Sequence, residues 1–261
     1  MTRPGCALRR TAFIAGLLAL SACAAPPGDD IPDPFEPANR VVHQANRLTD
    51  RVVMRPFAAV YGALAPTPFT GASLNVTQNL GLPVVAVNHL LQGEGELAIH
   101  SVLRFGANTI FGLGGMLDPA REMGLPHRPT DFGLTLRRWG LPEGVYTEAP
   151  LRGPGMTIDH VGAYASAALF GPLAATDWLL TTPAQTRFAS TASQAARVAA
   201  RHLSGPLIDE VLYESADSYV ALRGTVVSHR RYLASKTNVV EPGFDPLQDP
   251  FAPDVGPGET P

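Results

Sequence analysis

Three polar side chains recur at every fourth position of an otherwise apolar segment, residues 96–117. They are His100, Arg104 and Asn108, and this spacing places all three on one face of a helix. Such a polar stripe either satisfies partners inside a core or lines a passage that contains water. The residues themselves leave both possibilities open.

No pattern of covalent catalysis accompanies this stripe. The sequence has no Gly-x-Ser-x-Gly turn, no His-Glu-x-x-His pair, no Walker loop and no cysteine pair. Several histidines and aspartates could in principle meet in the fold, but their spacing predicts no site. These residues are His100, His127, His160, His202, Asp131, Asp159 and Asp177. We therefore expect a protein that is not an enzyme and that needs neither a metal nor a cofactor.

Cys23 is the cysteine for which we expect a chemical modification. Three arginines precede an apolar run over residues 11–20, which is too short to span a membrane and is typical of a signal peptide. The run ends in Leu20-Ser21-Ala22-Cys23, which predicts a lipoprotein that is cut before Cys23 and acylated there. The alternative is an ordinary signal peptide with a chance cysteine. Ala24, in place of an aspartate, mildly favours the outer membrane.

The cysteine count and the charge restrict the function further. Cys6 lies in the segment that is removed, so no thiol remains for a disulfide or a zinc site. The formal net charge is −3. Without the three signal arginines it is −6, and without the five acidic residues of the tail it is −1. A nearly neutral body argues against nucleic acid as a partner and against strong steering to anionic headgroups.

The apolar periodicity predicts mostly short helices. We expect helices over about 37–54, 84–91, 96–117, 130–136, 183–203 and 206–236, and two more within 161–180. A kink or break at Arg55-Pro56 precedes a second apolar stretch over 57–64. Residues 146–149 are compatible with a short strand, and Gly153-Pro154-Gly155 predicts a turn.

The predicted organisation is therefore one all-α domain with a few irregular or short-strand segments in its middle. The expected boundaries are a signal peptide over 1–22, the acylated cysteine and a flexible tether over 23–32, the helical domain over 33–236, and a disordered, acidic, proline-rich tail over 237–261.

Several ordered blocks of residues resemble one family, the VacJ-type (MlaA) outer-membrane lipoproteins. The blocks span residues 33–232 and begin with Asp33-Pro34-Phe35-Glu36. The matching residues for which a structural role is expected are Asn39, Arg40, Asn79, Pro83, Asn88, Gln92, Gly93, Phe105, Gly112, Gly114, Asp118, Asp131, Phe132, Gly133, Trp139 and Gly140. The chain departs from the family pattern at His43 and Ala45, where phenylalanine is common.

The resemblance implies a fold and a role. Such proteins form a ring of helices in the inner leaflet of the outer membrane, with an amphipathic channel through the ring that faces the periplasm. They lie beside trimeric porins, remove glycerophospholipids from the outer leaflet and pass them to a soluble periplasmic carrier, which maintains lipid asymmetry. In that setting His100, Arg104 and Asn108 are candidate channel or headgroup contacts, because arginine suits phosphate. The alternative is that Arg104 pairs with an acid such as Asp118 or Asp131.

Two other functions remain as alternatives. A porin-associated scaffold without a transport channel predicts a filled core. A periplasmic lipid hydrolase predicts a serine or threonine beside a histidine such as His100 or His160.

Overall fold

The computed structural model describes residues 31–65, 69–170 and 183–235, and for residues 183–190 only the backbone. The first part contains α2 (Glu36–Thr49), the π-helix η1 (Asp50–Met54), α3 (Arg55–Leu64), the 3-10 turn η2 (Phe69–Gly71), α4 (Ala72–Leu91), α5 (Gly95–Ile110) and α6 (Pro119–Glu122). The second part contains α7 (Phe132–Arg138), β1 (Tyr146–Ala149), β2 (Gly153–Met156), α8 (Thr157–Phe170), α10 (Pro183–Leu203), α11 (Gly205–Asp209), the π-helix η4 (Glu210–Glu214) and α12 (Ser218–Ser235). The predicted all-α class is confirmed.

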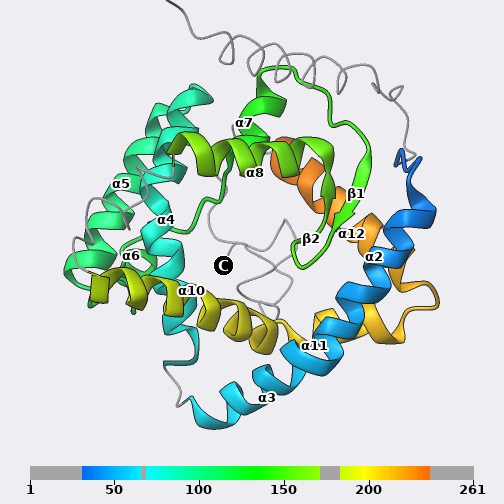
Figure 1. The fold of residues 1–261 in the computed structure, drawn as a ribbon. Helices are drawn as coiled ribbons and strands as arrows, with labels where there is room; N and C mark the ends of the chain where they lie inside the picture. The colour runs from blue at the N-terminus through cyan, green and yellow to red at the C-terminus, as the bar shows by residue number, and fades with distance from the viewer. Residues whose placement is uncertain (1–30, 66–68, 171–182, 236–261) are drawn as a thin grey trace, which may run out of the picture.

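The helices are arranged as a ring (Figure 1). α2 and α3 form one side, α4 and α5 the opposite side, and α10 packs against both α3 and α4. The ring closes where α2 meets β1 and the start of α12. There the side-chain amide of Asn39 donates to the carbonyl oxygen of Tyr146 at 3.2 Å, and Arg40 pairs with Asp217 at 2.9 Å. The first described helix is therefore joined to the last one, as the expected ring requires.

The hydrophobic core is small and lies where the strands β1 and β2 meet α8 and α12. It consists of the fully buried side chains Tyr146, Met156, Ile158, Tyr219 and Val227. The rings of Tyr146 and Tyr219 meet edge to face with centroids 5.8 Å apart, a favourable geometry for aromatic pairs. Elsewhere most of the buried apolar side chains are alanines, so the described helices approach one another closely.

A π-helix lies directly before Arg55-Pro56, where we expected a kink or a break. α2, η1 and α3 follow one another without interruption, and Pro56 lies in the first turn of α3. Proline has no N–H group, and in an α-helix its ring collides with the carbonyl group four residues earlier. The wider π turn immediately before it gives that carbonyl room, so the helix continues across the proline.

Two predictions about the helices α4 and α5 were wrong. Residues 72–91 form one helix, α4, with Pro83 inside it, and not a short helix that starts at residue 84. The extensive packing of α4 on α5 outweighs the loss of one backbone hydrogen bond at the proline. α5 ends at Ile110, because Gly114 and Gly115 adopt positive φ angles of 73° and 91° that an α-helix does not allow.

The middle and the end of the chain also differ in part from the prediction. The strand at 146–149 is confirmed, but Gly153-Pro154-Gly155, predicted as a turn, belongs to its antiparallel partner β2, with Tyr146 opposite Met156. The single helix expected over 206–236 is divided at residues 215–217, where Asp217 caps the next helix by accepting from the backbone N–H groups of Tyr219 and Val220. The helix expected over 183–203 is confirmed as α10, and residues 171–182 lie outside the described residues.

Large apolar side chains are exposed on many of the helices. On the continuous segment α2–η1–α3 they are Val41, Leu48, Val52, Val53, Phe57, Val60 and Leu64; on and just after α5 they are Ile99, Val102, Leu103, Ile110, Phe111 and Leu113. Soluble monomers rarely expose apolar residues in such contiguous stretches. Within the described part of the chain, no helix combines the length and the hydropathy that a bilayer crossing requires.

Candidate functional site

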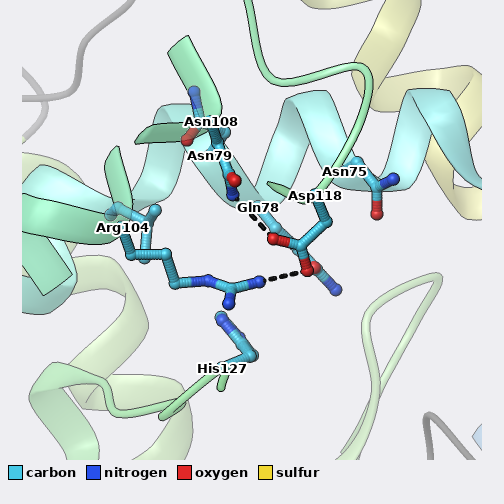
Figure 2. A pocket seen from close by; sticks show the side chains of 8 residues that line it. Asn75, Gln78, Asn79, Arg104, Asn108, Asp118 and His127 are labelled. Carbon is cyan, nitrogen blue, oxygen red and sulfur yellow. Dashed lines mark hydrogen bonds and ion pairs between the residues drawn. The ribbon is translucent and has the colours of Figure 1, made fainter. Parts of the chain in front are cut away.

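A polar pocket lies between α4, α5 and the segment that follows α5 (Figure 2). The space between its side chains amounts to about 190 Å³ including open solvent, and it encloses no room for a water molecule. Its lining is polar except for one leucine: Asn75, Gln78, Asn79 and Leu82 from α4, Arg104 and Asn108 from α5, Asp118 before α6, and His127. Two of the three residues of the predicted stripe therefore line one pocket.

Arg104 makes an ion pair at the centre of this pocket. Its guanidinium donates to the carboxylate of Asp118 at 2.5 Å and to the carbonyl oxygen of Leu125, and the residue is only 3% exposed. Asn108 donates to the other oxygen of Asp118 at 2.9 Å and accepts from the backbone N–H of Ala120 at 3.0 Å. The geometry therefore corresponds to the pairing of Arg104 with an acid, which joins α5 to α6. A headgroup contact at Arg104 stays a prediction.

Asn79 presents a buried polar atom to the same pocket. Its amide nitrogen donates to the hydroxyl of Thr109 at 3.0 Å, while its side-chain oxygen, also buried, has no hydrogen-bond partner among the described residues. A buried oxygen without a donor destabilises the fold by about 1–3 kcal/mol unless water or a ligand supplies one. This atom is therefore the place in the pocket where a bound donor would gain most.

His100 lies one turn before Arg104, outside the pocket lining. Burial, together with the cations Arg128 and Arg104, lowers the pKa of His100 below its ordinary value of 6.5. The imidazole is therefore neutral at pH 7, and it adds no positive charge to the stripe.

The family-motif residues at the end of α4 form a second polar cluster. Asn88 is completely buried and accepts from the hydroxyl of Thr135 at 2.8 Å, and Gln92 donates to the same hydroxyl at 2.8 Å. Trp139 donates its indole N–H to the carbonyl oxygen of Leu91 at 3.0 Å. These contacts fasten α4 to α7 and indicate a structural role for all three motif residues.

The other predicted motif residues lie at helix ends, turns and close contacts. Asn39 and Arg40 close the ring, Pro83 is inside α4, and Phe105 is half-buried on α5. Gly93 and Gly140 follow helices and have positive φ angles, and Gly112 and Gly114 lie in the turn after α5. Asp131 caps α7, and Phe132 and Gly133 are buried in the first turn of that helix. Cys23 lies outside the described residues.

Three arginine clamps were not predicted. Arg201 of α10 binds Asp50 at 2.8 Å and Asp209 at 2.5 Å. Arg223 binds Asp33 at 2.8 Å, and Arg230 binds both Asp131 and Asp159 at 2.6 Å. Most partners are more than 70 residues apart in sequence, and no local spacing indicates them. They fasten the C-terminal helices to the rest of the ring.

A serine beside a histidine does occur, although not at His100 or His160. The hydroxyl of Ser218 lies 2.9 Å from Nε2 of His43, and Nδ1 of His43 lies 3.2 Å from the carboxylate of Glu148. Ser218 is only 8% exposed. The backbone N–H groups that follow it, which could stabilise an oxyanion, already donate to Asp217. This arrangement is a buried hydrogen-bonded link between α2, β1 and α12, and it offers no accessible nucleophile.

Comparison with known protein families identifies this chain over most of its length. The family model described as MlaA lipoprotein matches residues 31–233. An uncharacterized protein from Rickettsia felis is 30% identical over 206 residues, which cover 79% of this chain and 78% of the relative.

Relatives with a described role are similar too. The intermembrane phospholipid transport system lipoprotein MlaA of Shigella flexneri is 29% identical over 87% of this chain and 89% of its own length. The protein of the same description from Escherichia coli K12 is 34% identical over 56% of this chain and 61% of its own. A solved structure, described as the structural basis for maintenance of bacterial outer membrane lipid asymmetry, superimposes with a TM-score of 0.62. It is 25% identical and covers 77% of this chain and 98% of that one.

Proposed function

This chain belongs to the MlaA lipoprotein family, and from that premise we propose that it maintains the lipid asymmetry of the outer membrane. It would remove glycerophospholipids from the outer leaflet through an amphipathic channel and pass them to a soluble periplasmic carrier. A trimeric porin is the partner we propose beside it in the membrane. The similarity to phospholipid transport lipoproteins along most of the chain supports this role.

The observation that carries the proposal is the distribution of apolar side chains on a ring of helices. Long stretches of α2–η1–α3 and α5 expose leucine, isoleucine, valine and phenylalanine, while the described helices include none that could span a bilayer. A ring with such an apolar exterior is stable when its helices lie within one leaflet, because their backbone hydrogen bonds are already satisfied internally.

The polar pocket of Figure 2 supplies the contrasting surface that a lipid path needs. A glycerophospholipid has an anionic, hydrogen-bonding headgroup and two apolar chains. Asn75, Gln78 and the unpartnered oxygen of Asn79 offer hydrogen-bonding groups on α4. We propose that these residues, with His100, Arg104 and Asn108 nearby, belong to the polar wall of the channel.

The proposed attachment to the membrane combines two elements. Acylated Cys23, at the start of the tether 23–32, routes the chain to the outer membrane and holds it at the inner leaflet, facing the periplasm. The helical domain over 33–236 adds its own apolar surface, and the acidic tail over 237–261 remains in the periplasm. Multiple acyl chains form a stable anchor, since each buried methylene contributes about 0.8 kcal/mol.

Deletion of the gene tests the proposed function. We expect phospholipid to accumulate in the outer leaflet, measured by labelling of surface-exposed phospholipid in intact cells, and the wild-type gene to restore asymmetry. Unchanged asymmetry would refute the transport role. Altered porin assembly with unchanged asymmetry would instead support the scaffold alternative.

Substitution of Arg104 separates a lipid contact from a purely structural ion pair. Arg104→Ala removes charged hydrogen bonds to Asp118 and Leu125, so we expect the free energy of unfolding to fall by about 2 kcal/mol. Asp118→Ala breaks the same pair and is the matched control. If Arg104 contacts headgroups, only its own substitution raises outer-leaflet phospholipid at equal protein level. Normal asymmetry in a stably folded Arg104→Ala variant would remove this residue from the lipid path.

A further inference from the structure

Three arginines of the segment α2–η1–α3 surround one tyrosine ring. The guanidinium carbons of Arg47, Arg51 and Arg55 each lie 5.2 Å from the centroid of Tyr213. The hydroxyl of Tyr213 is fixed by hydrogen bonds to the carbonyl oxygen of Arg47 and to the carboxylate of Asp50. We call Arg47, Arg51, Arg55 and Tyr213 the arginine cluster.

Two π-helices build this cluster. In a regular α-helix, residues i, i+4 and i+8 rotate away from one another by about 40° per step. The wider turn of η1, which includes Arg51 and ends just before Arg55, offsets part of that rotation, so all three arginines reach the same ring. Tyr213 itself lies in the second π-helix, η4. Interruptions of this kind are frequent at functional sites.

The positive charge of the cluster is only partly compensated. Arg55 pairs with Asp209 at 3.1 Å, and the nearby Arg201 binds both Asp50 and Asp209. Arg51 makes no ion pair within the described residues, and Arg47 donates only weakly, to Ser218 at 3.4 Å. The Nε of Arg47 is buried without a hydrogen-bond partner among them. Four guanidinium groups therefore share two carboxylates.

A second arginine–tyrosine contact, made by Arg40 of α2, includes acidic partners. Arg40 lies 4.6 Å from the ring centroid of Tyr219, but it also pairs with Glu36 at 2.8 Å and with Asp217 at 2.9 Å. Its charge is thus neutralised within the protein. Stacking on tyrosine therefore does not exclude an acidic partner. The exposed Arg51, which has no acidic partner among the described residues, is available to an external anion, and the half-buried Arg47 lies beside it.

Exposed apolar side chains border the cluster along the same segment. Leu48, Val52, Val53 and Phe57 are sequence neighbours of its arginines, and each is at least 43% exposed. A partner that matches both features carries an anionic group directly attached to apolar chains. A phospholipid at the surface of the leaflet has this chemistry, whereas a free anion matches only the charge.

We propose that the arginine cluster binds the phosphate of an anionic phospholipid, with the acyl chains lying along the neighbouring apolar side chains. The planar donors of Arg47 and Arg51 suit the phosphate oxygens, and the stacking on Tyr213 holds them in place before the lipid arrives. The inference rests on the proposed location of the ring in a leaflet. It adds a lipid site at the periphery, separate from the pocket between α4 and α5.

Short-chain lipids test this site in the full chain, purified in a neutral detergent. We expect dihexanoyl phosphatidylglycerol to bind, measured by calorimetric titration. Its affinity should fall roughly fivefold in Arg51→Gln, because each arginine near an anionic surface contributes about 1 kcal/mol. The double variant Arg47→Gln/Arg51→Gln should lose more affinity. Arg121→Gln is the matched control, because Arg121 is exposed and lies on α6, which packs on α5 at the opposite side of the ring (Figure 1). The affinity of this control should match the wild type.

Each outcome decides between defined possibilities. Arg51 is exposed and makes no ion pair with another described residue, so Arg51→Gln should fold normally, which circular dichroism verifies. Unchanged lipid affinity in this folded variant would overturn the proposal. Inorganic phosphate that binds as tightly as the lipid would show a site for free anions and would also overturn it. Normal lipid asymmetry after gene deletion, with lipid binding intact, would instead remove the proposed function and leave this site standing.

Discussion

Replacement of Arg230 by methionine should lower the free energy of unfolding by about 2–3 kcal/mol, because it removes charged hydrogen bonds to Asp159, whose side chain is 14% exposed, and to Asp131, whose side chain is 49% exposed. Arg230 is 16% exposed and donates to both Asp131 and Asp159 at 2.6 Å. It therefore joins α12 to the start of α7 and to α8. Methionine keeps the volume but leaves two neighbouring carboxylates without their cation.

Arg231 provides the control next to it. Its side chain is 37% exposed, and its contact with Glu143 is long, 3.4 Å. Exposed pairs of this kind contribute between zero and about 1 kcal/mol, so Arg231→Met should be nearly neutral. Thermal and chemical unfolding of the full chain in detergent measure both variants. Equal stabilities of the two variants would contradict the role of Arg230 as a clamp.

The same clamp predicts a pH dependence. Burial favours the neutral form of Asp131, but the hydrogen bonds and the charge of Arg230 outweigh it, so the pKa of Asp131 lies below its ordinary value of 3.8. A lowered pKa in the folded state stabilises the protein above the unfolded-state value, and this contribution disappears as the pH falls through the folded-state pKa. The difference in stability between wild type and Arg230→Met should therefore be complete at neutral pH and shrink below about pH 4.

Gly162→Val should destabilise the protein by about 3 kcal/mol or more, at the upper end of the effects of overpacking. Gly162 of α8 touches the backbone of Gly133 in α7, and a Cβ added at Gly162 would lie 2.4 Å from the Cα and the nitrogen of Gly133. Backbone atoms cannot move aside as a flexible side chain can. The two helices would have to separate, which would also pull Asp159 of α8 away from Arg230 of α12.

A second glycine in a helix interior serves as the comparison. Gly224 lies within α12, and a Cβ added there meets nothing within 4 Å. Alanine is the better helix former by up to about 1 kcal/mol, so Gly224→Ala should be neutral or slightly stabilising. A Gly162→Val variant that unfolds at the wild-type temperature would show that α7 and α8 do not need this close approach.

The outer surface links the fold to the proposed location in a membrane. A small core of two tyrosines, a methionine, an isoleucine and a valine leaves many larger apolar side chains outside. Arginine clamps and buried amides hold the described helices together. They join the helices to one another, so the apolar exterior of the ring is left free to face the proposed membrane.

Local features of the chain could be predicted because they depend on neighbours in sequence. Apolar periodicity determined the all-α class, the bounds of α10 and the strand at 146–149. The ordered motif blocks determined the family. Pro83 misled the prediction, since tertiary packing compensated for the missing hydrogen bond inside α4, whereas at Pro56 the α-helix is interrupted only by a π turn.

The polar stripe could be predicted as a helical face, but not its surroundings. The periodicity placed Arg104 and Asn108 together, and only the fold brought Asp118 to both of them. Asn79, the pocket residue with an unpartnered oxygen, lies on a different helix. The sequence showed that Asn79 belongs to a family motif, but nothing in it indicated that this residue would face Arg104 and Asn108.

The sequence by itself determined the all-α class, which cysteine is expected to carry lipid and how little net charge the body has. Only the tertiary structure decided where the charges lie. Asp50 and Arg201 are 151 residues apart and meet because the ring closes, while Arg47, Arg51 and Arg55 collect around Tyr213 of a distant helix. A nearly neutral chain thus acquires a local excess of positive charge. Net charge is a sum over residues, whereas the field at a site depends on distances that are set when the ring closes.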